Sequence, residues 1–323
     1  MGGRPVPGRH DHHVRPDRQR TRTPPVITLR HHLLTVVAVF LALAVGIVLG
    51  GGPLSDVGQT VVAAADDDDD PAATDDQART AYTESYVRAL GPGAIGGRLA
   101  DRSVAMVTLP GADERLVSAL AEQVGVSGGT VSARYEISDD LVDPGQKSLV
   151  DTLGSQLLTQ QAEGDVAADA STYDRIGQLL GLAVATKEVE GQEVNGKARA
   201  IVDAVSGAGL MEEPAEVAQR APLVLLVLGT DAGDEGSDAI LAGLAQGLAA
   251  QSVGLVLAGT TADGGSGQLG RFRADPASAG VASLDGIDTV AGRVATIITL
   301  QRSLATPGGA FGASGADGPV PLG

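Results

Sequence analysis

The run Leu223–Leu228 (LVLLVL), followed by Ser237–Gln251 and by Val253–Ala258 (VGLVLA), decides the fold of this chain. The first and third segments are short and uninterruptedly apolar, which is typical of strands buried on both faces. The middle segment has the length of a helix. A strand, a crossover helix and a second strand in this order form a parallel unit. The sequence therefore predicts an α/β domain with a parallel sheet.

Similar segments continue on both sides of this unit. Two or three glycine-spotted helical segments are expected between residues 145 and 210. The other predicted elements are a strand at Ser103–Leu109, a helix at Glu114–Val124, a strand at Thr130–Tyr135, a short strand at Val281–Leu284 and an amphipathic helix at Thr289–Leu304. Strands that alternate with helices favour a Rossmann-like or flavodoxin-like sheet covered on both faces.

A second stretch predicts a membrane anchor. Residues 33–54 read LLTVVAVFLALAVGIVLGGGPL and contain no charged side chain. About 20 apolar residues in a helix cross the hydrocarbon core of a bilayer. Arg30 precedes the stretch and the run Asp66–Asp70 follows it, which predicts a cytoplasmic N-terminus and an extracytoplasmic body. We therefore expect a single-pass protein of the cell membrane that contacts the lipid bilayer through residues 33–54.

A cleaved signal peptide is the alternative interpretation of this stretch. Ala63-Ala64-Ala65 offers a small-residue cleavage site downstream of a basic N-terminal region. However, the apolar run is longer than the roughly 7–15 residues of a secretory signal, and the alanines lie well beyond its end. The sequence therefore favours an uncleaved anchor, and a mature N-terminus at Asp66 would reverse that interpretation.

Small residues recur at every fourth position of the anchor, at Ala38, Ala42, Gly46 and Gly50. Residues at this spacing share one helix face and let two membrane helices approach closely. The pattern predicts a homo-oligomer contact through this face. The alternative is that alanine and glycine are simply frequent throughout the chain.

The predicted organisation has five parts. These are a basic cytoplasmic tail (1–30), the transmembrane helix (31–54), an Asp/Ala-rich linker with a short helical stalk (55–98), the extracytoplasmic α/β domain (99–304) and a disordered Gly/Pro/Ala-rich tail (305–323). In the stalk, apolar residues at four-residue intervals predict a helix over Asp75–Leu90, which Gly91-Pro92-Gly93 ends.

Charge and cysteine content exclude several classes of function. The net charge is −17, although residues 1–30 hold seven arginines against two aspartates. An acidic body argues against nucleic acid as a partner, because phosphate binding needs clustered Lys and Arg. Cysteine is absent, so disulfides, thiolate metal sites and cysteine nucleophiles are excluded.

The loops that follow the predicted strands do not carry a nucleotide motif. They are Leu109-Pro110-Gly111, Gly229-Thr230-Asp231 and Gly259-Thr260-Thr261, and none reads G-x-G-x-x-G. Gly191–Lys197 matches G-x-x-x-x-G-K, but Ala198 stands where Mg²⁺ binding needs Ser or Thr. We interpret these glycines as turn residues, and Thr230 and Asp231 as helix N-cap residues.

Histidine is confined to the N-terminal part of the chain, at positions 10, 12, 13, 31 and 32. The body therefore has no Ser–His–Asp set and no histidine-built zinc site. A Ser–Lys or two-carboxylate arrangement stays open, although no spacing points to one. Copper(I) prefers sulfur ligands, and the methionines are Met1, Met106 and Met211. We predict no enzyme, no catalytic residue and no cofactor, and we assign no metal ligand.

The anchor region also resembles a known family. Residues 27–32 (ITLRHH) and 39–50 (VFLALAVGIVLG) are similar to the start of the actinobacterial MctB-like copper transporter family. Weaker matches follow in family order: Asp101-Arg102-Ser103-Val104, Thr108-Leu109-Pro110, Gly128-Gly129 and Asp288-Thr289-Val290-Ala291-Gly292. The resemblance covers about residues 26–304. The basic head of the chain is extra, and the short Asp/Ala-rich stretch replaces the family's charged coiled-coil segment.

The resemblance implies a cell-envelope protein in copper efflux and copper homeostasis, with channel-type transport and a copper ion as its partner. No Cys, Met or His motif corresponds to a ligand set, so no site residue is carried over. The alternative hypothesis is a non-catalytic, anchored interaction or scaffold protein in cell-envelope biogenesis or cell separation. In that case the acidic body binds another envelope protein.

Overall fold

A six-stranded parallel sheet lies at the centre of the computed structural model, which describes residues 71–212, 214, 217 and 219–322. Its strands are β1 (Ser103–Thr108), β2 (Thr130–Glu136), β5 (Leu223–Val227), β6 (Gly254–Gly259), β7 (Ala282–Asp285) and β8 (Ala310–Gly312). Every neighbouring pair in the order β2-β1-β5-β6-β7-β8 is parallel. The predicted α/β class with a parallel sheet is confirmed.

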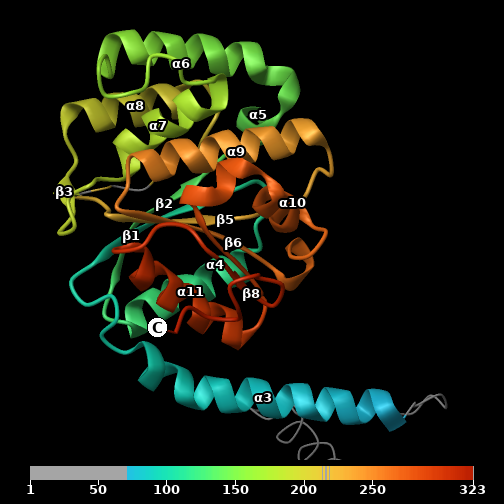
Figure 1. Ribbon diagram of the computed structural model, residues 1–323. Helices are drawn as coiled ribbons and strands as arrows, with labels where there is room; N and C mark the ends of the chain where they lie inside the picture. The colour runs from blue at the N-terminus through green and yellow to red at the C-terminus, as the bar shows by residue number, and fades with distance from the viewer. Residues whose placement is uncertain (1–70, 213, 215–216, 218, 323) are drawn as a thin grey trace, which may run out of the picture. The chain divides into compact units, whose positions relative to one another are not determined.

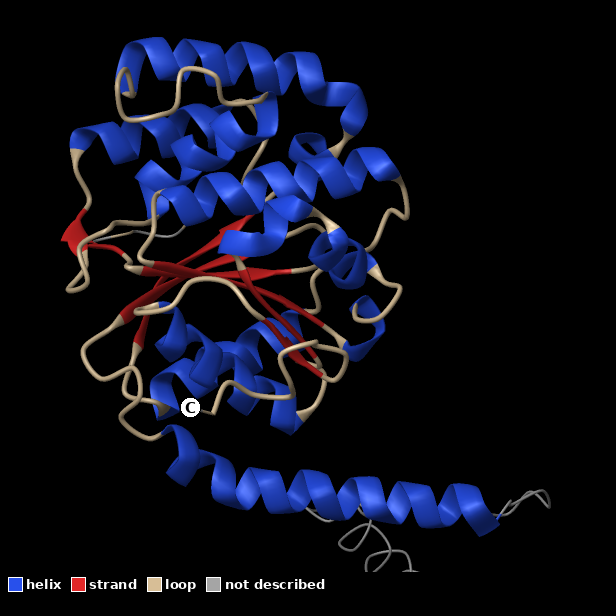
Figure 2. Cartoon of the chain, viewed as in Figure 1, coloured by secondary structure: helices blue, strands red, loops and turns tan. Residues whose placement is uncertain are grey.

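Helices cover both faces of this sheet (Figures 1 and 2). The α-helices are α3 (Pro71–Ile95), α4 (Glu114–Val126), α5 (Asp139–Val142), α6 (Lys147–Gln161), α7 (Thr172–Val184), α8 (Gly196–Gly207), α9 (Glu235–Ala250), α10 (Gln268–Ala274) and α11 (Val290–Ser303). One face carries α4 and α11. The other carries α9 and α7, which pack on each other, with α6 and α8 as a further layer. A separate antiparallel pair joins β3 (Gln192–Glu193) to β4 (Gln219–Arg220).

The alternation of side chains along the strands divides the core into two clusters. In β1, Val104 and Met106 belong to the cluster beneath α4 and α11, whereas Ala105 and Val107 belong to the cluster beneath α7 and α9. Both clusters are almost entirely aliphatic. Strands buried on both faces therefore need the continuous apolar runs that the sequence shows.

The strand order is that of a doubly wound, flavodoxin-like sheet. With the main-sheet strands renumbered along the chain, β2-β1-β5-β6-β7 gives the order 2-1-3-4-5. The connection from β1 runs through α4 on one face, and the connection from β5 runs through α9 on the opposite face. The carboxyl ends of β1 and β5 therefore form the point where the winding direction changes, and ligands bind at such points in this class of fold.

The C-terminal segment differs from the expectation of disorder over 305–323. Residues up to 322 are described, and β8 within them pairs with β7. Phe311 is 3% exposed, and its carbonyl accepts a hydrogen bond of 2.6 Å from Arg273 Nη2. Composition alone predicted a disordered tail, because Gly and Pro dominate it. The C-terminal segment is nevertheless ordered, because it forms a short strand at the edge of the sheet and buries Phe311.

The stalk helix is longer than predicted at both ends. It was expected to end at Gly91-Pro92-Gly93, but α3 continues through Pro92 to Ile95. Ile95 is fully buried in the core cluster beneath α11, and a side chain on Gly91 would press against Val294 Cγ2 at 2.9 Å. Tertiary packing therefore holds the last turn helical, despite the amide hydrogen that Pro92 lacks.

The start of α9 also differs from the sequence interpretation. Thr230 and Asp231 were expected to cap it, but the N-cap residue is Asp234, whose carboxylate accepts a hydrogen bond of 2.9 Å from Ser237 N. Asp231 instead pairs with Arg271 from α10. The start of α9 was predicted too early, because several residues of this Gly/Asp-rich loop have side chains that can cap a helix N-terminus.

In the part of the chain that the structure describes, no helix combines the length and apolarity needed to cross a bilayer. The predicted anchor at residues 33–54, with its small-residue face, lies outside the described residues, as do the basic tail and the linker up to residue 70.

Candidate functional site

The turns that follow β1 and β5 meet at the point where the winding of the sheet changes. Thr230 N donates a hydrogen bond of 2.8 Å to the Pro110 carbonyl. A Cβ atom on Gly229 would overlap that same carbonyl, so only glycine allows the two turns to approach this closely. Gly111 has a φ of 81°, in the left-handed region that favours glycine. The two turns are therefore in direct contact at this point of the sheet.

Two cavities open on either side of the turn Leu109-Pro110-Gly111. The first, called here the apolar cavity, has a volume of about 480 Å³ and lies toward α9. Its walls are mostly aliphatic, and its polar groups come from loops and helix starts. The lining residues are Leu109, Pro110, Gly111, Asp139, Val142, Thr230, Ala232, Ser237, Ile240, Leu241 and Gln268.

The second cavity, called here the acidic cavity, has a volume of about 320 Å³ and lies toward α4. It shares the turn and Asp139 with the apolar cavity. Its lining adds three further carboxylates, together with hydroxyl groups from strand ends. The lining residues are Thr108, Leu109, Pro110, Gly111, Ala112, Glu114, Val117, Glu136, Ile137, Ser138, Asp139 and Glu212. We call the two cavities together the carboxyl-edge cleft.

Arg271 pairs with two carboxylates beside the apolar cavity. Its guanidinium donates hydrogen bonds of 2.7 Å to Asp231 and of 2.7 and 3.0 Å to the two oxygens of Asp238. The hydrogen bond from Arg271 is the main reason that the pKa of Asp231 lies below its usual value, and both carboxylates raise the pKa of Arg271. The two carboxylates at this end of the cleft therefore share one guanidinium, and each of them has a cationic partner.

Most carboxylates of the acidic cavity have no such partner. Glu114 pairs with Arg134 at 2.6 Å, but Glu136, Asp139 and Glu212 make no ion pair with any described residue. All three are exposed at the rim of the cavity. This end of the cleft is therefore electronegative.

The lining of the cleft does not offer the positive charge that binding of an anion needs. Neither lining contains a Lys, Arg or His among the described residues. The described part of the chain also has no group of three His, Cys, Asp or Glu residues arranged to hold a metal ion. The prediction of no catalytic residue, no cofactor-binding residue and no assigned metal ligand stays a prediction.

The glycine motif at residues 191–197 is built as a turn and a helix start. Gly191 precedes β3, and α8 begins at Gly196 with Asn195 as its N-cap. Lys197, the residue that would contact a phosphate in a phosphate loop, pairs with the carboxylate of Asp165. This geometry explains the motif without a bound nucleotide.

The sequence analysis identified the turn after β1 and Thr230, but it did not identify the other residues that line the cleft. Thr108 and Glu136 are the last residues of β1 and β2, and their position at strand ends was a usable signal. Gln268 and Glu212 come from segments distant in sequence, so only the fold brings them to the turn. The family-like segment Thr108-Leu109-Pro110 begins at the last residue of β1, and Asp288-Thr289-Val290-Ala291-Gly292 runs from the loop after β7 into the first turn of α11.

Comparison with known proteins gives one consistent result. The sequence model of a family described as copper transport outer membrane protein, MctB, matches residues 26–321. Copper transporter MctB of Mycobacterium tuberculosis (H37Rv) is 28% identical over 307 residues, which cover 85% of this chain and 92% of that protein. Copper transporter MctB of Mycobacterium leprae is 27% identical over 313 residues, with 86% and 93% covered.

Proposed function

Because this chain belongs to the MctB family of copper transport proteins, we propose that it acts in copper efflux and copper homeostasis as a membrane-anchored protein of the cell envelope. The observation that carries the proposal is the extent of the family match. It runs from residue 26 to residue 321 and therefore includes both the predicted anchor and the whole sheet domain. The mycobacterial relatives named copper transporter match over a similar length.

The proposed topology has a single pass through residues 33–54, with the N-terminus in the cytoplasm and the α/β domain outside. One helix cannot enclose a conduit, so channel-type transport requires an oligomer. The face formed by Ala38, Ala42, Gly46 and Gly50 supplies the contact in this proposal, because small residues let helix backbones approach.

The body has a non-enzymatic role in this proposal and does not hold copper itself. Met106 is fully buried and Met211 is 2% exposed, so neither sulfur is available at the surface. Copper(I) prefers sulfur ligands, and the chain has no cysteine. The copper-related role therefore depends on the anchor, on assembly or on a partner.

A second candidate function is that of an anchored interaction protein in cell-envelope biogenesis or cell separation. The carboxyl-edge cleft favours it, because an electronegative cleft without a catalytic set suits recognition of another protein. Both candidates share the same topology. They differ in whether the loss of the protein changes the movement of copper.

A gene deletion in the native host tests the copper role. We expect the deletion strain to accumulate more cellular copper under copper load than the parent, as measured by elemental analysis, and the full chain to restore the parental level. A Gly46→Leu/Gly50→Leu variant should fail to restore it, because the larger side chains separate the helices. The matched control Val45→Leu/Ile47→Leu, off that face, should restore it. Unchanged copper in the deletion strain contradicts the copper role and leaves the interaction role.

A further inference from the structure

We propose that the carboxyl-edge cleft binds a basic segment of a partner protein, with a Lys or Arg head group in the acidic cavity and a neighbouring apolar side chain in the apolar cavity. The inference rests on the proposed role of the body in recognising a partner, and it adds the chemistry of that partner.

The negative charge of the acidic cavity has no matching cation among the described residues. Glu136, Asp139 and Glu212 have no ion-pair partner there, whereas the carboxylates beside the apolar cavity are paired with Arg271. An unmatched cluster at the edge of a cleft attracts and orients a partner of opposite charge. The asymmetry also fixes a direction, because the basic group belongs at the α4 end.

The floor of the acidic cavity supplies an independent observation. Thr108 is 7% exposed and lines the cavity, and its hydroxyl makes no hydrogen bond to any described residue. The side chain is enclosed, but its hydroxyl is not one of the fully buried polar atoms without a partner among the described residues, so the oxygen stays accessible from the cavity. The Thr108 hydroxyl can accept a hydrogen bond from an ammonium or guanidinium group that enters between the carboxylates.

The size of the cavity and the arrangement of the carboxylates favour an organic cation over a metal ion. In the described part of the chain, no three acidic side chains are placed to coordinate one ion. A volume of about 320 Å³ is also far larger than one ion needs and suits a long basic side chain. Guanidinium and ammonium groups can contact dispersed carboxylates, because each carries several N–H donors.

The apolar cavity indicates that the cation belongs to a peptide rather than to a free amine. It shares the turn Leu109-Pro110-Gly111 with the acidic cavity, so one ligand can contact both. Its aliphatic walls suit a side chain such as Leu. Gln268 is 5% exposed, and its side-chain amide makes no hydrogen bond to any described residue, so this amide is placed to pair with a peptide group.

Binding of short peptides to the purified full chain in detergent tests the inference. The probe is acetyl-Gly-Leu-Arg-Gly-amide, titrated by isothermal calorimetry. Citrulline in place of Arg keeps the shape but removes the charge, and we expect it to weaken binding at least about tenfold. Glycine in place of Leu should weaken binding about fivefold or more, because it empties the apolar cavity. Spermidine should bind more weakly than the probe.

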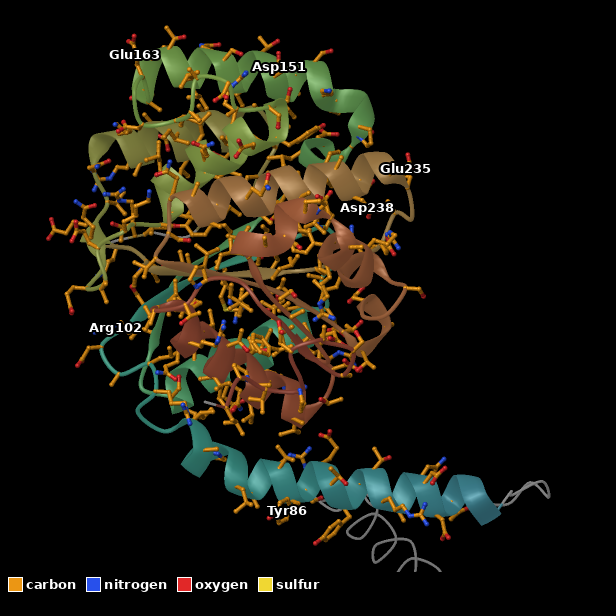
Figure 3. The ribbon with its side chains drawn as sticks, in the orientation of Figure 1. Tyr86, Arg102, Asp151, Glu163, Glu235 and Asp238 are labelled. Carbon is orange, nitrogen blue, oxygen red and sulfur yellow. The ribbon has the colours of Figure 1, made fainter. Side chains whose placement is uncertain are left out.

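Substitutions in the cleft locate the site. We expect Glu136→Gln/Glu212→Gln to weaken probe binding about five- to tenfold, because two exposed charges contribute modestly each. Thr108→Val should weaken it further when combined with that pair. The matched control Glu163→Gln/Asp169→Asn removes the same charge from exposed positions in the loop between α6 and α7, and Figure 3 labels Glu163. The control should bind like the wild type.

Three outcomes would overturn the inference. They are equal binding of the citrulline probe, spermidine binding as tightly as the peptide, and equal weakening by the cleft pair and its matched control. These outcomes are separable from failure of the copper role. The peptide titration contains no copper, and copper accumulation is measured in cells with the unaltered chain.

Discussion

At the scale of single residues, the pair Arg273–Asp285 joins the last two strands to α10. Asp285 is 1% exposed, and its Oδ1 lies 2.9 Å from Arg273 Nη2. Its Oδ2 accepts a hydrogen bond of 2.9 Å from Ser314 N, and Arg273 also donates to Ser283 Oγ at 2.9 Å. Arg273 and Asp285 therefore both help to hold the chain beyond β7 against the sheet.

Removal of that arginine should be costly. Arg273→Ala leaves the buried Asp285 carboxylate without its cation, and we expect a loss of about 3–5 kcal/mol in the free energy of unfolding. Urea unfolding followed by circular dichroism measures it. The control is Arg79→Ala, because the Arg79–Asp76 pair has side chains 75% and 74% exposed and should contribute little. Equal losses in the two variants would contradict the structural role of Arg273.

The ion pair between Asp231 and Arg271 predicts how the stability of the protein depends on pH in the acid range. Arg271 lowers its pKa in the folded protein, so the stabilisation from this pair is complete above the usual aspartate value of about 3.8. It is lost as the pH falls through the lower folded-state pKa. The Asp231→Asn variant should therefore lose less stability than the wild type over about pH 5 to 2, as measured by urea unfolding at each pH. Arg271→Gln should flatten the profile similarly, and a variant profile parallel to the wild type would refute the pairing.

At the scale of elements, β8 shows how a short strand can complete a sheet. It covers the edge of β7, and its Phe311 packs beneath the Arg302 guanidinium at 5.2 Å from the ring centre. Gly312 has a φ of 107°, and a Cβ there would overlap the Asp285 carbonyl. The strand therefore depends on both a buried aromatic residue and a backbone that only glycine adopts easily.

A truncation tests this element. A chain that ends at Leu304 loses β8, exposes the β7 edge and removes the Phe311 carbonyl that Arg273 contacts. We expect it to lose about 3 kcal/mol or more of stability, and to aggregate because an unpaired edge strand pairs with other chains. Urea unfolding and light scattering measure the two effects. A chain that ends at Pro321 retains β8 and should behave like the full chain.

The helix α3 has two faces with different roles. Glu84 accepts a hydrogen bond of 3.0 Å from Val290 N, the first amide of α11, so this side of α3 is tied to the sheet domain. Tyr82 and Tyr86 stack on each other and are 72% and 56% exposed, and Figure 3 shows Tyr86 projecting from the helix. The four-residue spacing that predicted the helix is therefore an exposed stripe rather than its packed face.

At the scale of the whole molecule, the distribution of ligand atoms gives a prediction about copper. All histidines lie in residues 10–32, cysteine is absent, and the two methionines of the body are buried. We expect the full chain to fail to compete for copper(I) with a high-affinity chelator, measured by the chelator's absorbance. A His10→Ala/His12→Ala/His13→Ala variant should behave identically toward copper(I). Stoichiometric removal of copper(I) from the chelator would show a site that these residues do not explain.

The sequence by itself determined the class of the fold. The apolar runs at 223–228 and 253–258 required strands buried on both faces, and the segment between them was long enough for a crossover helix. Local signals also located the start of α4, because Asp113 is an ordinary N-cap residue and its carboxylate accepts the Arg115 amide hydrogen bond. Such features depend on neighbours a few residues apart, which is why they can be predicted from a pattern.

Only the tertiary structure decided the order of the strands and the contact between the turns that follow β1 and β5. It also decided that the C-terminal strand is ordered and that the cleft forms. Gly229 is indistinguishable from other turn glycines until Pro110 is placed against it. Thr108, Glu136, Glu212 and Gln268 come from four separate segments, and no spacing in the sequence joins them. The physical reason is that burial and contact between distant segments depend on how these segments pack together in the folded chain. A residue pattern specifies local periodicity, but it does not specify which distant segments pack together.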